Sequence, residues 1–155
     1  RPPFSRSRDL AALIASDRRL AEATILADPD YLVETVPYFH DNPTYLPREA
    51  RFGNVVKFTR NAQARRELAD LLAAARGIAA DTRQPVLILL AAPLDPEAPP
   101  QLRKQSYAWE FVTTPEQVRE FLGATRLLAH IGPAKKKTEG DYDVYLLDPP
   151  PVRGQ

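Results

Sequence analysis

The chain of 155 residues contains no cysteine and no methionine, and it has only six glycines. The absence of cysteine excludes disulfide bonds, zinc sites built on thiolates and thiol nucleophiles. The glycines occur singly, and neither G-x-G-x-x-G nor the phosphate-binding pattern G-x-x-x-x-G-K-[ST] is present. Because position 1 is not methionine, we expect a piece excised from a longer protein.

The sequence also lacks an excess of charge and any long apolar run. Lys and Arg number 21 against 20 for Asp and Glu, a net charge of +1, so the electrostatic footprint of a nucleic-acid partner is missing. The longest apolar run, 85–93, is far shorter than the roughly 20 residues of a membrane-spanning helix. We expect one domain over residues 7–148, between a linker at 1–6 and a proline-rich tail at 149–155.

Hydrophobic periodicity predicts an alternation of helices and strands. The first half should contain a helix near 7–20, a strand at 23–27, a helix after Asp28, a strand at 44–46 and a long helix from Asn61. The second half should contain a buried strand at 85–91, a strand at 107–112, a helix capped by Thr114 and two strands at 126–131 and 142–147. This order predicts an α/β, three-layer Rossmann-like sandwich with a mainly parallel sheet and an antiparallel C-terminal hairpin.

Ligands of open α/β sheets bind beyond the carboxyl ends of the parallel strands. This rule selects Asp28 and Asp30 after the first strand, Arg48 after the second and Asp95 after the third. A structural interpretation competes at each position: Asp28 could simply cap the next helix, and Arg48 with its neighbours could form a solvated turn.

The stretch from Tyr31 to Arg51 is rich in aromatic residues beside Asp, Asn and Arg. Tyr31, Tyr38, Tyr45 and Arg51 have the chemistry of a sugar or anion site, with apolar walls and a few orienting polar groups. The same tyrosines could instead be half-buried at the edge of the core.

No motif predicts a metal, a cofactor or a catalytic residue. The two histidines, His40 and His130, are far apart and have no ligand at the spacing of a metal site. His130 lies in an apolar strand and is interpreted as a core residue. No serine has the G-x-S-x-G context of a nucleophile. The run Lys135–Lys137 favours a solvated hairpin tip over a contact with acidic lipid headgroups.

Several segments together resemble a known class of domain. They are 27–34 (ADPDYLVE), 36–39 (VPYF), 42–49 (NPTYLPRE) and 143–147 (DVYLL). They are similar to the extracytoplasmic domain of bacterial polytopic membrane proteins that resemble lipid-linked-sugar glycosyltransferases. The resemblance implies an accessory domain on the periplasmic face, because the catalytic carboxylates of such enzymes lie in membrane-proximal loops outside this segment.

The partners that the resemblance implies are the membrane-embedded remainder of the same polypeptide and a sugar or lipid-linked sugar. Two other classes stay open. A stand-alone small-molecule binder or enzyme would need a concave crevice around Asp28, Arg48 and Asp95. A protein-interaction module would need an exposed apolar patch of several hundred Å².

Overall fold

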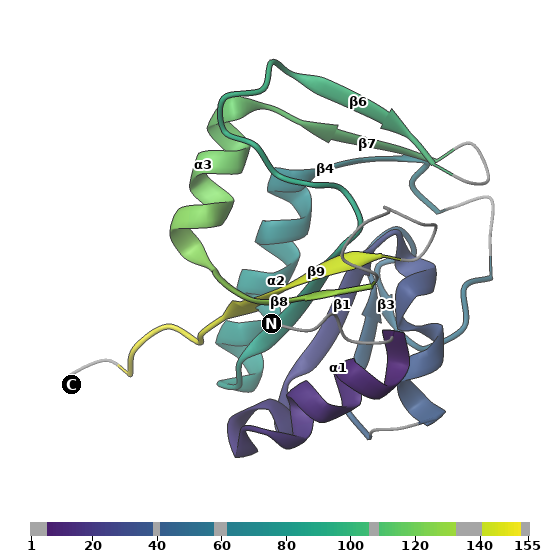
Figure 1. Cartoon of the computed structure of the whole chain (residues 1–155), viewed down its shortest axis with the longest axis vertical. Helices are drawn as coiled ribbons and strands as arrows, with labels where there is room; N and C mark the ends of the chain where they lie inside the picture. Colours follow the sequence, from purple (N-terminus) through teal and green to yellow (C-terminus); the bar gives the residue numbers. More distant parts are fainter. Residues whose placement is uncertain (1–5, 39–40, 58–61, 106–108, 133–140, 153–155) are drawn as a thin grey trace.

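The computed structural model describes residues 6–38, 41–57, 62–105, 109–132 and 141–152. Helices and strands alternate along the chain, as the sequence predicts for the α/β class (Figure 1). The first half contains α1 (Arg6–Ala15), η1 (Arg18–Glu22), β1 (Thr24–Asp28), η2 (Asp30–Tyr38), β2 (Thr44–Leu46), β3 (Arg51–Phe52) and β4 (Arg65–Glu67). The second half contains α2 (Leu68–Thr82), β5 (Val86–Leu90), β6 (Gln101–Lys104), β7 (Glu110–Thr113), α3 (Pro115–Ala124), β8 (Arg126–Ile131) and β9 (Tyr142–Leu147).

The larger sheet has six strands in the order β3-β2-β1-β5-β9-β8. The strand β1 runs parallel to β2 and β5, whereas the other three pairings are antiparallel. The predicted C-terminal hairpin is confirmed, since β8 pairs antiparallel with β9. The sheet is mixed rather than mainly parallel, because β9 returns beside β5 in the antiparallel sense.

Side chains from both faces of the six-stranded sheet are buried against helices. On one face Leu26, Ile88 and Tyr145 pack with α2 and α3, and on the other Ile25 and Leu87 pack with α1 and η2. All five residues of β5 are buried. This explains the uniformly apolar run at 86–90, since a central strand covered on both faces has no solvent-facing side.

A second, three-stranded sheet in the order β4-β7-β6 lies over one end of the larger sheet (Figure 1). The sequence did not indicate it. The long helix was expected to start at Asn61, but Arg65 and Arg66 belong to β4, and α2 begins at Leu68. The strand β4 has a polar sequence and forms through pairing with β7, more than 40 residues later, so local periodicity carries no signal for it.

Other local predictions are confirmed. The Thr114 hydroxyl accepts a hydrogen bond from the Gln117 backbone N–H at the start of α3, and Pro115 occupies its first turn. Leu68, Leu71 and Leu72 form the buried face of α2. Within the described residues, no helix is both long and apolar enough to cross a membrane.

Candidate functional site

Arg48 lies two residues after β2 and fills the space between the two sheets with only 1% of its surface exposed. Its Nη2 donates to the Asp28 carboxylate, 3.1 Å away. Its other acceptors, which lie around the second sheet, are the side-chain oxygen of Gln105 and the backbone carbonyls of Gln63, Ala64 and Glu110. Arg48 was interpreted as part of a solvated turn, and the burial shows that this was wrong.

Asp28 is the last residue of β1, and both of its carboxylate oxygens have partners. One accepts from Arg48 and the other accepts from the Gln105 amide at 2.8 Å. Burial raises the pKa of Asp28 above its ordinary value, and the Arg48 guanidinium and the Gln105 amide oppose that rise. Neither oxygen bonds to a helix N–H, so the capping interpretation of Asp28 is incorrect.

Asp30 is fully buried beside this pair. Its Oδ2 accepts the Arg48 backbone N–H at 3.1 Å, whereas its Oδ1 has no hydrogen-bond partner among the described residues. Burial raises the pKa of Asp30 from 3.8 to about 7, and the Arg48 groups offset only part of the rise. A carboxyl that is half protonated near neutral pH therefore lies next to a charged ion pair.

Trp109 covers the guanidinium of Arg48. The Arg48 Cζ lies 4.7 Å from the centroid of the indole ring, within the range of a cation–π contact. Tyr31, from η2, stacks against the same indole with centroids 6.3 Å apart and an interplanar angle of 19°. Trp109, the only tryptophan of the chain, is 5% exposed and therefore buried. We call Arg48, Asp28, Asp30, Gln105 and Trp109 the arginine clamp.

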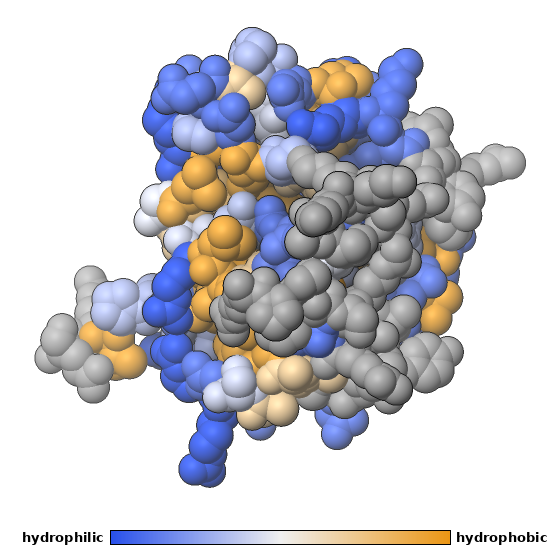
Figure 2. All heavy atoms as spheres, in the orientation of Figure 1, coloured by the Kyte–Doolittle hydropathy of each residue, from blue (hydrophilic) through white to orange (hydrophobic). Residues whose placement is uncertain are grey.

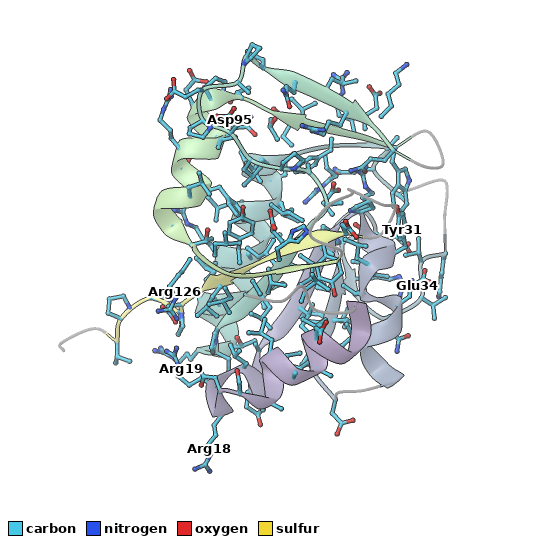
Figure 3. The ribbon with its side chains drawn as sticks, in the orientation of Figure 1. Arg18, Arg19, Tyr31, Glu34, Asp95 and Arg126 are labelled. Carbon is cyan, nitrogen blue, oxygen red and sulfur yellow. The ribbon has the colours of Figure 1, made fainter. Side chains whose placement is uncertain are left out.

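Tyr45, Arg51 and Asp95, which the sequence also selected, make their contacts outside the clamp. Tyr45 packs edge to face with Phe52, and Arg51 pairs with Glu49 at 2.9 Å and donates to the Val55 carbonyl. Asp95 is exposed, and its carboxylate accepts the Glu97 N–H; in Figure 3 it lies on the opposite side of the molecule from Tyr31. The side chain of Tyr38 lies outside the described residues.

Sequence reasoning selected Asp28, Asp30 and Arg48 through the strand-end rule but missed their partner Gln105. Gln105 is 77 residues from Asp28, and it follows β6, a strand that the sequence did not indicate. A lone glutamine after a proline-rich connection carries no local signal. The backbone carbonyls that bind Arg48 could not be predicted from the sequence either, because every residue type has one.

His130 does not extend the site. His130 is exposed rather than a core residue, and its Nδ1 lies 2.7 Å from Asp143 on the paired strand β9. His40 and Lys135–Lys137 lie outside the described residues. In the part of the chain that the structure describes, no three His, Asp or Glu side chains are grouped to hold a metal ion.

No protein-family model, curated protein or solved structure matches the chain. Its function is therefore inferred from the geometry of the clamp together with the sequence resemblance. The clamp joins β1, the turn after β2 and the strands of the second sheet through charged and polar contacts. The Arg48 guanidinium and the Asp28 carboxylate bind each other, and both also bind further groups of the chain. This is the arrangement of a buried structural link.

Proposed function

We propose that this chain is a non-catalytic accessory domain of a membrane-embedded protein that resembles lipid-linked-sugar glycosyltransferases. The domain would lie on the periplasmic face of a bacterial inner membrane. It would be tethered there to the membrane-embedded remainder of the same polypeptide. Its role is to present a rigid surface near the acceptor or the lipid-linked sugar, while the catalytic carboxylates lie elsewhere in the polypeptide.

The observation that carries this proposal is that the protein itself engages Asp28, at the end of β1, and Arg48, just after β2. A catalytic or ligand-orienting carboxylate must face its substrate, but both Asp28 oxygens are bound by Arg48 and Gln105. Four of the five donor N–H groups of Arg48 are directed at protein oxygens. These groups hold the two sheets together, and a rigid scaffold is what an accessory domain requires.

We further propose that the six-stranded sheet and its helices are a divergent three-layer Rossmann-like sandwich. The parallel strands β2-β1-β5 and the burial of both sheet faces support this assignment. The antiparallel β3, β8 and β9 and the additional three-stranded sheet are departures from that class.

A protein-interaction module receives less support, because the large apolar side chains that are exposed among the described residues come from separate elements. They come from β3, the segment after it, β6, α3, β8 and the C-terminal segment: Phe52, Val55, Leu102, Leu122, Leu127 and Val152. On the face shown in Figure 2, hydrophobic and hydrophilic residues alternate over α3 and the three-stranded sheet. A recognition patch of several hundred Å² would be contiguous.

The proposal is tested on the full-length polypeptide that carries this chain. Membrane fractionation should place it in the inner membrane, and a reporter fused after residue 148 should be active only in the periplasm. Membranes should transfer sugar from a lipid-linked donor, whereas the 155-residue chain alone should transfer none. Turnover by the chain alone, or a polypeptide found only in the soluble fraction, would refute the proposal.

A further inference from the structure

A surface hollow of about 470 Å³ lies beside the hairpin of β2 and β3. Its wall includes Asn42, Thr44, Phe52 and Gly53, together with the exposed Asp41 and Asn54. Asn42 and Thr44 lie at the start of β2, whereas Arg48 follows its end, and no residue of the clamp lines the hollow. The hollow is therefore separate from the arginine clamp.

Hydrogen bonds fix the wall of this hollow. The Asn42 amide donates to the carbonyls of Leu20 and Ala23, at 2.7 and 2.9 Å. Two hydrogen bonds join Thr44 and Gly53. The Thr44 hydroxyl donates to the Gly53 carbonyl at 2.6 Å, and the Gly53 N–H donates to the Thr44 carbonyl at 2.9 Å. A wall held in this way is organised before any ligand arrives, which lowers the entropic cost of binding.

Phe52 gives the hollow an exposed aromatic face. Its side chain belongs to the edge strand β3 and is 55% exposed. The Tyr45 ring supports it edge to face, with centroids 5.1 Å apart and an interplanar angle of 76°. A phenyl ring that is held in place and left in water offers apolar surface to a ligand.

Polar groups without partners lie next to this ring. Among the described residues, no hydrogen bond or ion pair engages the side chains of Asp41 and Asn54, and both are exposed. The Asn42 Oδ1 also accepts nothing from the described residues, although its amide nitrogen donates twice. Together they supply a carboxylate, amide oxygens and an amide donor on one wall.

We propose that this hollow is a binding subsite for a neutral sugar residue. A pyranose has an apolar C–H face that can stack on Phe52, and it has hydroxyl groups that can bond to Asp41, Asn42 and Asn54. The hollow is within the range of about 300 to 1,000 Å³ found for small-ligand sites. Among the described residues no lysine or arginine lines it, and the carboxylate of Asp41 repels phosphate, so a neutral ligand is favoured over an anion.

This inference deepens the proposed function and rests on it for the source of the sugar. For a lipid-linked sugar or a glycan acceptor, the hollow would receive the sugar residue and leave the phosphates outside. The subsite orients the ligand and carries out no bond-forming step.

The test is a ¹⁵N NMR titration of the 155-residue chain with the methyl glycosides of mannose, galactose, glucose and arabinose. Adenosine and inorganic phosphate serve as comparison ligands. At least one glycoside should shift the amides of 41–44 and 52–54 saturably, with a millimolar Kd. Phe52→Ala should weaken binding by about tenfold, which corresponds to an aromatic contact of about 1.4 kcal/mol.

The matched control is Leu102→Ala, which removes an exposed apolar side chain from β6 and should leave the Kd unchanged. Phe52→Tyr should retain binding, and Asn54→Ala supplies a second disabling variant if Phe52→Ala does not fold. The proposal is overturned if no glycoside shifts these amides. It is also overturned if Phe52→Ala binds as well as the unsubstituted chain, or if only adenosine or phosphate binds.

The result of the NMR titration does not depend on the result of the membrane experiment. A chain that binds a glycoside through Phe52 but comes from a soluble polypeptide would refute the accessory role and keep the subsite. A membrane-embedded transferase whose domain binds no glycoside would keep the accessory role and refute the subsite.

Discussion

Replacement of Arg48 by methionine should be among the most damaging single changes in the core. Methionine keeps the apolar stem of the side chain but removes the guanidinium. Asp28 would then be left as a carboxylate only 2% exposed, with Gln105 as its remaining side-chain partner among the described residues. Three backbone carbonyls would also lose the Arg48 donor. Breaking a buried ion pair from one side costs about 3 to 5 kcal/mol.

This loss is large compared with a typical total stability of about 5 to 15 kcal/mol. For a chain of this size it corresponds to a fall of roughly 6 to 20 °C in Tm. Urea titration followed by far-UV circular dichroism measures the free energy of unfolding, and calorimetry measures the Tm. Both readouts are independent of the fluorescence of Trp109, whose surroundings the substitution changes.

Arg76→Met is the matched control. Arg76 also pairs with a carboxylate, that of Glu120 at 2.9 Å, but the two side chains are 50% and 57% exposed. A solvent-exposed pair contributes about 0 to 1 kcal/mol, so this variant should be nearly neutral. Equal losses of stability in Arg48→Met and Arg76→Met would refute the structural role of the clamp. A double-mutant cycle with Asp28→Asn should give a coupling energy of about 0.5 to 3 kcal/mol, as for residues in direct contact.

Three further changes test other parts of the clamp. Folding raises the pKa of Asp30 from 3.8 to about 7, so the free energy of unfolding should fall as the pH rises from about 4 to about 7. Urea titrations at several pH values measure this dependence. The slope should be smaller in Asp30→Asn. Asp28→Ser should destabilise the fold by more than the roughly 0.5 kcal/mol expected if capping were its role, measured by calorimetry. Trp109→Ala should cost about 3 to 5 kcal/mol in urea titration, and the native Trp109 should emit at shorter wavelength than free tryptophan. The first prediction is contradicted if stability does not change with pH, and the second if Asp28→Ser leaves stability unchanged. The third is contradicted if native Trp109 emits at the wavelength of free tryptophan in water.

The amino-acid sequence determined the elements whose signal is local. Strands at 44–46, 126–131 and 142–147 and the capped start of α3 were predicted at their observed positions. The apolar run around Ile88 indicated a central strand buried on both faces. In each case hydrophobic spacing or a cap within a few residues decides the structure, so the chain itself carries the information.

Only the tertiary structure decided the second sheet and the environment of Arg48. The strand β4 is polar and β6 is short, and each forms because β7 offers backbone partners to it. From sequence, Arg48 was interpreted as part of a solvated turn, with a ligand-binding role as the alternative. It becomes a buried clamp because folding brings Asp28 and Gln105, 20 and 57 residues away, to the same guanidinium. Burial and partner choice are properties of the assembled chain, and no local pattern encodes them.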